Sequence, residues 1–184
     1  FFSDCLHCDG PVGVKNAHAD DALRPNQLFL ITLGVVTNEA MAIPCVEACR
    51  ELIVPGAIRS LADRKVSYPL EIYHNGELLK DPHYPYTGVY KGDEDRFRKP
   101  AYHNGTAWTW PFPVFCEAWA MVFGQTSFST SLAWIGSVIN LMRKGAAGYI
   151  PEILDGDYPH TQRGCDAQAW GSSEVSRVIH KLLN

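Results

Sequence analysis

The spacing of apolar residues along the chain predicts helices joined by polar connections. Leu132, Ile135, Ile139 and Met142 recur at helical spacing, which predicts an amphipathic helix over residues 127–144. Apolar segments at 26–36, 44–53 and 105–123 are long enough for buried helices, and residues 175–182 show the spacing of a last helix. Residues 58–61 are short enough for a strand. The pattern therefore favours an all-α domain of about five helices.

A polar stretch at 62–100 separates the predicted helices and is rich in tyrosine, proline, glycine and charge. Structureless loops of this length are uncommon in compact domains and tend to be functional or disordered. The tyrosine and proline content favours an ordered lid over disorder. Since function in such folds usually lies in the connections, we expect the site there.

Composition narrows the class of protein. The 184 residues are 46% hydrophobic and 20% charged, with a net charge of −4, as expected for one ordinary globular domain. This charge gives no basic patch for nucleic acid or an anionic membrane surface. No apolar run approaches the roughly 20 residues of a membrane span. We expect a cytoplasmic protein with no cofactor and with neither nucleic acid nor membrane as a partner.

Six cysteines raise the question of disulfides and metals: Cys5, Cys8, Cys45, Cys49, Cys116 and Cys165. The chain is longer and less cysteine-dense than a secreted disulfide scaffold, so we expect reduced thiols. Cys5 and Cys8 flank His7 and could form half of a zinc site, with Cys45 and Cys49 as a second half. Buried thiols also pack as small hydrophobes, and we assign no metal site from the sequence.

Three connections combine carboxylates or amides with arginine, histidine or aromatic groups next to an apolar helix. They span residues 20–27, 101–111 and 149–170. Sugar-binding sites need this mixture, because aromatic faces stack on the C–H faces of a pyranose while polar groups bind its hydroxyls. Trp108 or Trp110 alone is more readily interpreted as a core residue. Three such connections in one chain favour a carbohydrate site.

The last connection holds three acids, Glu152, Asp155 and Asp157. Acids near helix starts usually cap the helix or oppose its dipole, and the dipeptide that begins at Asp155 is a common turn. Glu152 differs because it lies between Ile150 and Ile153, where an acid is unfavourable to bury without a partner or a purpose. Glu152 is therefore the strongest candidate for chemistry.

The segments DALRPNQLFLITL, AYHNGTAWTWPF and IPEILDGDYPHTQRGCDAQAWGSSEV together resemble the C-terminal part of the amylo-α-1,6-glucosidase domain of glycogen debranching enzymes. The resemblance runs over about residues 20–179 and implies an (α/α)6 toroid of the six-hairpin glycosidase type. Such a toroid needs roughly twice this length. Residues 1–184 are therefore expected to form the second half of the toroid, with long ordered loops and the upstream half of the same domain as their partner. The chain begins without methionine, and we expect it to be part of a longer polypeptide.

The resemblance also implies an activity. The expected reaction is inverting hydrolysis of α-1,6-linked glucosyl residues on glycogen-like branched α-glucan, with Glu152 as the general base and the general acid on an upstream aspartate. Inverting enzymes hold these carboxyls roughly 6.5–9.5 Å apart. The residues implied around the terminal glucose, with Asp155 as a group that orients loop or substrate, are Arg24, Asn26, Gln27, Tyr102, His103, Trp108, Asp155, Gln168 and Trp170.

Two other functions fit the same residues. A glucoamylase-like or trehalase-like glycosidase would have similar pocket chemistry with another linkage preference. A non-catalytic carbohydrate-binding module belongs to a different class, and the absence of an upstream catalytic aspartate would favour it. A zinc-binding scaffold is a third alternative, which metal analysis would test.

Overall fold

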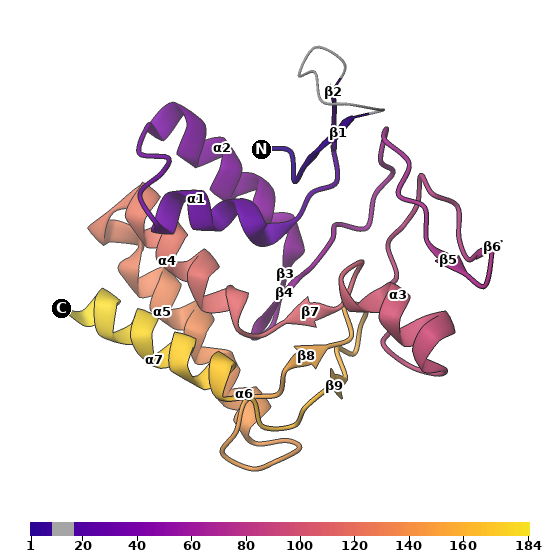
Figure 1. The fold of residues 1–184 in the computed structure, drawn as a ribbon. Helices are drawn as coiled ribbons and strands as arrows, with labels where there is room; N and C mark the ends of the chain where they lie inside the picture. Colours follow the sequence, from indigo (N-terminus) through magenta and orange to yellow (C-terminus); the bar gives the residue numbers. More distant parts are fainter. Residues whose placement is uncertain (9–16) are drawn as a thin grey trace.

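The computed structural model describes residues 1–8 and 17–184, in which a group of helices lies against a small antiparallel sheet with long loops (Figure 1). The helical elements are η2 Pro25–Gln27, α1 Leu28–Thr32, α2 Glu39–Cys49, η3 Arg50–Leu52, η4 Glu94–Arg98, α3 Lys99–Tyr102, α4 Pro111–Phe123, η5 Gln125–Ser127, α5 Phe128–Gly136, α6 Val138–Met142 and α7 Ala169–Leu183. The strands are β1 Leu6–Cys8, β2 Ala17–Ala19, β3 Ile53–Val54, β4 Ala57–Arg59, β5 Tyr73–His74, β6 Glu77–Leu78, β7 Ala107–Trp108, β8 Ile153–Leu154 and β9 Gln162–Arg163.

The predicted all-α fold, and with it the second half of an (α/α)6 toroid, is wrong. The structure is 43% helical and holds a five-stranded antiparallel sheet in the order β3-β4-β7-β8-β9, so it is mixed α/β. Each of these strands has two or three residues, which is too short for a visible apolar-polar alternation. Residues 105–123, predicted as one helix, form β7 followed by α4, which begins at Pro111 because proline suits a first helical turn.

Helix α4 is the centre of the helical layer. It packs against α1, α2, α5 and α7, and its residues Phe112, Phe115, Cys116 and Ala118 are fully buried. A helix that is apolar on nearly every side is stable only when neighbours surround it. The predicted burial of this segment is therefore correct for most of α4, up to Ala120, but not for Met121 in its last turn.

One charged side chain interrupts the apolar surface of α4. Glu117 is 2% exposed and accepts hydrogen bonds from Arg177 Nη2 and Lys181 Nζ of α7, each at 2.6 Å. Burial opposes the charged form, but the hydrogen bonds from both cations outweigh it and hold the pKa of Glu117 below its usual value. This ion pair joins α4 to α7.

The five-stranded sheet brings distant connections side by side. Ile58 pairs with Trp108, and Trp108 pairs in turn with Ile153 on its other side. Side chains of Val54, Ala57, Ala107, Leu141 and Leu154 form a small core between the sheet and α6. The stretches around residues 58, 108 and 153 thus meet in one sheet, which places parts of two predicted sugar-site connections together.

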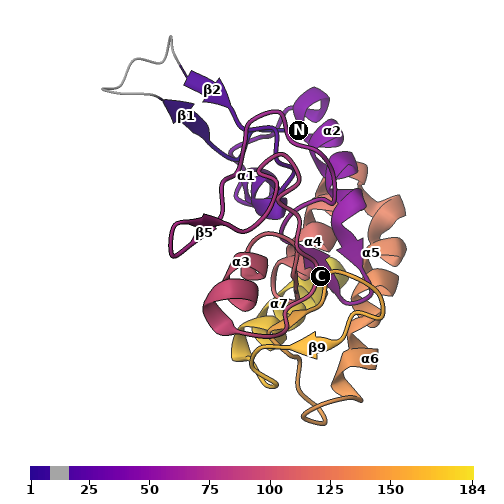
Figure 2. The same ribbon diagram turned by 90° about the vertical axis from the view of Figure 1, so that its right-hand side faces the viewer.

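The stretch 62–100 is ordered against the end of this sheet. The Tyr90 N–H donates to Asp155 Oδ1 at 2.8 Å, and the Tyr86 hydroxyl donates to Asp157 Oδ1 at 2.8 Å. The Gly156 N–H donates to the carbonyl of Gly88 at 2.6 Å. Figure 2 shows β5 and α3 on one side of the molecule and α5 and α6 on the other. The long connection is therefore bound to the residues between β8 and β9, and its strand β5 lies on the side of the molecule away from α5 and α6.

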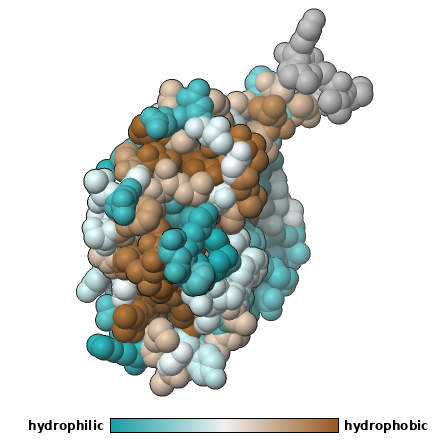
Figure 3. Space-filling model, turned by 90° about the vertical axis from the view of Figure 1, so that its left-hand side faces the viewer, coloured by the Kyte–Doolittle hydropathy of each residue, from teal (hydrophilic) through white to brown (hydrophobic). Residues whose placement is uncertain are grey.

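The helical layer also leaves apolar side chains in contact with solvent. Leu33 and Val35 after α1, Met121 in α4 and Leu183 at the end of α7 are between 47% and 75% exposed. Figure 3 views the molecule from the left-hand side of Figure 1 and shows apolar residues gathered over part of this side, which we call the helical face. Within residues 1–8 and 17–184, no helix has both the length and the apolar character needed to cross a membrane.

Candidate active site

A cavity of about 520 Å³, which we call the aromatic pocket, lies where the N-terminal residues, η2 and the segment after α3 meet. It contains members of all three predicted connections. Its lining residues are Asp4, Cys5, His7, Asp20, Arg24, Pro25, Asn26, Ser60, Leu70, His103, Trp108, Trp110, Pro111 and Trp170. The fold thus gathers the polar and aromatic groups that the sequence places far apart.

Three tryptophans form the aromatic wall of the pocket. Trp110 stacks on Trp170 with ring centroids 4.1 Å apart and planes 16° from parallel. Trp108 stacks on His103, with centroids 5.3 Å apart and planes 7° from parallel. Trp170 is 49% exposed, so the stack leaves ring surface open. Such surfaces suit the apolar C–H faces of a sugar.

Arg24 fixes the polar wall of the pocket. Its guanidinium donates to the carbonyls of Ser60 and His103 and to Asn104 Oδ1, and its Nε lies 3.5 Å from Asp4 Oδ2. Burial lowers the pKa of Arg24, while Asp4 opposes that change. Burial and then the Arg24 charge lower the pKa of His103, which leaves its imidazole neutral at neutral pH.

Glu152 lies beside this pocket, immediately before β8. Its backbone carbonyl accepts from the Thr109 N–H at 3.3 Å and from Thr109 Oγ1 at 3.1 Å. Its half-buried carboxylate accepts from the Tyr102 hydroxyl on Oε1 and from the Cys165 N–H on Oε2, the latter at 3.0 Å. Hydrogen bonds therefore hold both the backbone and the side-chain carboxylate of Glu152 in place.

Tyr102 links this carboxylate to the aromatic wall. Its ring meets Trp108 edge to face at 4.6 Å, and its carbonyl accepts from Trp108 Nε1 at 2.9 Å. Burial, and then the hydrogen bond to Glu152, raise the pKa of Tyr102, so its hydroxyl stays protonated and acts as the donor. Neither Glu152 nor Tyr102 is among the described residues that line the pocket.

Gly164 leaves room for the Glu152 carboxylate. Its φ of +69° is a backbone conformation that favours glycine, and a Cβ added there would overlap Glu152 Oε2 and approach Ile153. The Arg-Gly-Cys turn therefore does two things for Glu152: Gly164 stays clear of its carboxylate, and Cys165 supplies a backbone donor to it.

Comparison with known protein families identifies the chain at this point. The sequence model for amylo-alpha-1,6-glucosidase matches residues 11–177, which is nearly the whole chain. The chain belongs to the amylo-alpha-1,6-glucosidase family. The resemblance inferred from the sequence is thereby confirmed. No curated protein sequence matches the chain. Family membership supports a glycosidase-related domain of glycogen debranching.

In this amylo-alpha-1,6-glucosidase family member, about half of the residues predicted around the sugar line the pocket: Arg24, Asn26, His103, Trp108 and Trp170. Gln27 lies below it, with its amide donating to the Arg24 carbonyl at 2.9 Å and accepting from the Phe2 N–H at 3.0 Å. Its buried amide is therefore occupied by the chain itself.

Asp155 and Gln168 also lie outside the pocket lining. Asp155 is 4% exposed, pairs with Arg163 at 2.9 Å and accepts from the Tyr90 N–H, so it holds two loops together. Gln168 precedes α7 and donates through its backbone N–H to Ile150 O at 3.1 Å. Its buried Oε1 has no hydrogen-bond donor in the described part of the chain.

The N-terminal contribution to the pocket was not predicted. Asp4, Cys5 and His7 line the pocket together with Asp20, whereas the first of the predicted connections begins at residue 20. Within residues 1–8 and 17–184, Cys5, His7 and Asp20 are the group whose ligand atoms could hold a metal ion. Neither Cys45 nor Cys49 belongs to that group. The Cys-x-His spacing on a short strand was the available signal, since alternate residues share one face.

Proposed function

We propose that this chain is part of a glycoside hydrolase that removes α-1,6-linked glucosyl residues from a glycogen-like branched α-glucan with inversion. Glu152 is the general base. The observation that carries the proposal is the position of its carboxylate, fixed by Tyr102 and Cys165 beside a pocket with three tryptophans. Family membership supplies the substrate class.

The aromatic pocket suits a terminal glucose. Its volume of about 520 Å³ falls within the roughly 300–1,000 Å³ of small-ligand sites. Trp170 and Trp110 offer a stacked surface for the ring, while Arg24, Asn26 and His103 offer polar groups for hydroxyls. Stacking combined with charge-assisted hydrogen bonds distinguishes a sugar from a purely apolar ligand.

The carboxylate of Glu152 retains the capacity to accept a proton. A carboxylate offers about four lone-pair positions, and Tyr102 and Cys165 use two of them. A water hydrogen-bonded to a remaining position would lose its proton to Glu152 as it attacks the anomeric carbon. Tyr102 stays protonated and therefore does not compete for that proton.

The general acid is proposed to come from outside residues 1–184, as the resemblance implies. Two acids of the same connection are engaged: Asp155 pairs with Arg163, and Asp157 accepts from the Tyr86 hydroxyl. The remainder of the family domain is the proposed partner. The exposed apolar side chains on the helical face offer a surface for it.

Product stereochemistry tests this proposal. A protein that contains residues 1–184 with the rest of the family domain is given a branched dextrin carrying α-1,6-linked glucosyl stubs. Proton NMR should show β-glucose as the first product, because a water activated by Glu152 inverts the anomeric carbon. α-Glucose as the first product would exclude the role of Glu152 as the base in an inverting reaction.

A non-catalytic carbohydrate-binding role is the second candidate. One observation favours it: Glu152 is not among the described residues that line the pocket. In that role the protein binds the dextrin, releases no glucose from stubs of any linkage, and loses binding when Trp170 is replaced. Glucose release that depends on Glu152 would exclude it.

A further inference from the structure

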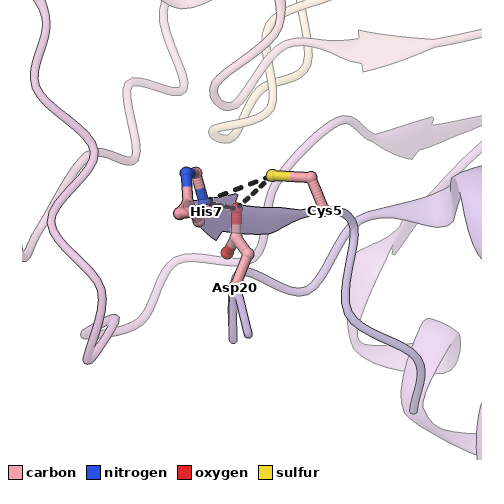
Figure 4. Close-up of side chains that lie close together, drawn as sticks. All are labelled: Cys5, His7 and Asp20. Carbon is pink, nitrogen blue, oxygen red and sulfur yellow. Dashed lines mark hydrogen bonds and ion pairs between the residues drawn. The ribbon is translucent and has the colours of Figure 1, made fainter. Parts of the chain in front are cut away.

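Three potential metal ligands converge at the N-terminal rim of the pocket. Cys5 Sγ lies 3.2 Å from His7 Nε2 and 3.6 Å from Asp20 Oδ2, and His7 Nε2 lies 3.2 Å from Asp20 Oδ2. Figure 4 shows the three side chains pointing toward one another. The proposed glycosidase mechanism uses none of these three groups.

The hairpin formed by β1 and β2 produces this convergence. Cys5 and His7 are two residues apart, so their side chains leave the same face of the strand. The Asp20 N–H donates to the Cys5 carbonyl at 3.0 Å, continuing the β1–β2 ladder in which Leu6 pairs with Ala19. Directly opposite residues share a face, so Asp20 projects to the side of Cys5 and His7.

Without an ion, hydrogen bonds hold the three groups: Cys5 Sγ donates to Asp20 Oδ2, and His7 Nε2 lies within hydrogen-bond distance of both partners. Both Cys5 Sγ and Asp20 Oδ2 approach the same nitrogen of His7, and that nitrogen has either one proton or one lone pair. It therefore makes one good hydrogen bond at a time. A cation placed between the three atoms interacts with all of them at once.

The spacing of the three ligand atoms is within about 0.4 Å of the spacing around a tetrahedral zinc ion. Zinc bonds of about 2.0–2.3 Å at tetrahedral angles put neighbouring ligand atoms about 3.3–3.6 Å apart. The three observed separations are 3.2, 3.2 and 3.6 Å. A thiolate with an imidazole also selects zinc over magnesium or calcium, which prefer oxygen ligands.

Neighbouring groups hold two of the ligands in position. Asp20 is 3% exposed, and its Oδ1 accepts from the Ala22 N–H at 2.7 Å, which leaves Oδ2 toward the other ligands. The His7 ring stacks on Tyr68 with centroids 3.8 Å apart and planes 11° from parallel. Partners of this kind orient ligands at zinc sites.

We propose that Cys5, His7 and Asp20 bind a zinc ion at the rim of the aromatic pocket. All three residues line the pocket, so the fourth coordination position is open to water or to a hydroxyl group of a ligand bound there. Three protein ligands with one open position are typical of zinc that meets a substrate. This proposal goes beyond the glycosidase function and does not depend on it.

Cobalt(II) is the probe that tests the site, because a thiolate bound to cobalt gives a near-ultraviolet charge-transfer band. Titration of the full 184-residue chain under reducing conditions should give this band at one equivalent of cobalt. Addition of zinc should remove it. Cys5→Ser should abolish the band, whereas the matched control Cys8→Ser should keep it, because Cys8 lies one residue after His7 and leaves the opposite face of β1.

A second variant separates loss of the site from loss of the fold. Asp20→Asn keeps an oxygen for the Ala22 N–H but removes the charged ligand. Its zinc affinity should fall more than about 100-fold, the upper range for loss of an outer partner, while its circular dichroism stays unchanged. The proposal is overturned by a band that survives Cys5→Ser, by a band that is lost in Cys8→Ser, or by the absence of stoichiometric cobalt binding.

Discussion

Glu117 in the helical layer and Glu152 just before strand β8 are both acids within apolar segments, yet their surroundings differ. Glu117 is nearly fully buried and bound by two cations, Arg177 and Lys181. Glu152 is half-buried, and the donors that hold its carboxylate are a neutral hydroxyl and a backbone amide. Two cations balance the charge of the first carboxylate inside the fold, whereas the donors that hold the second are uncharged groups.

This difference separates an acid that is part of a buried ion pair from the acid that we propose as the general base. A carboxylate paired with two cations already has strong partners in the folded state, so it has little tendency to take a proton from water. Neutral donors orient a carboxylate without cancelling its charge. The same sequence signal, an acid inside an apolar run, therefore has two different physical origins in this molecule.

The largest effect is expected on the rate of glucose release when Glu152 is replaced by glutamine, with the same substitution at Glu117 as the control. In a protein that holds the rest of the family domain, Glu152→Gln should lower the rate of glucose release by about 10²–10⁴-fold, the usual contribution of a general base. Its free energy of unfolding should barely change. Glu117→Gln is the matched control and should leave the rate per folded molecule unchanged. Equal rates for Glu152→Gln and the unchanged protein would end the assignment of the base.

The next effect concerns the stability of the helical layer. Replacement of Arg177 and Lys181 together by methionine leaves the Glu117 charge buried without a partner, so the free energy of unfolding should fall by about 3–5 kcal/mol. Adding Glu117→Leu to that variant should restore most of the loss, because the buried charge is then gone as well. Urea denaturation measures both changes. A loss in the double variant below about 1 kcal/mol would show that the pair contributes as little as a surface ion pair.

The smallest expected effect is a dependence on pH. Glu117 has a pKa below its ordinary value of 4.5, so its ion pairs stabilise the fold above about that pH. This contribution should be lost as the pH falls through the lowered pKa, where the carboxylate takes up a proton. The difference in unfolding free energy between the unchanged protein and Glu117→Gln should therefore shrink between about pH 6 and about pH 3. Urea midpoints that stay equally separated over this range would contradict the lowered pKa.

The sequence predicts α4, α7 and most of the pocket connections, but the one helix predicted over residues 127–144 is divided into η5, α5 and α6. The apolar segment that becomes α4 and the periodic residues of α7 are long enough for their pattern to be read. The strands are too short for a readable pattern. Two-residue strands such as Ala107–Trp108 and Ile153–Leu154 form because distant segments contact each other. Local pattern contains no information about such pairing, and this is why the all-α prediction failed.

The residues of the candidate site were likewise predicted only in part from the sequence. Trp108 and Trp170 are predicted from the kind of residue and from the family resemblance, and the structure places both in the pocket. Glu117 was overlooked, although it interrupts an apolar run as Glu152 does. Cys5, just before β1, and His7 of β1 meet Asp20 because β1 pairs with β2. Contacts of that kind depend on strand register, and a single sequence does not specify it.

The attachment of Glu152 at three points has a consequence for conformational entropy. A free glutamate side chain loses up to about 1.5–2 kcal/mol of rotamer freedom when it is fixed in one position. For Glu152 this loss occurs when the protein folds, because Thr109 binds its carbonyl while Tyr102 and Cys165 bind its carboxylate. In the proposed reaction, a water molecule that binds beside the carboxylate would have only its own freedom to lose. The fold would then fix the position of that water before a glucan binds.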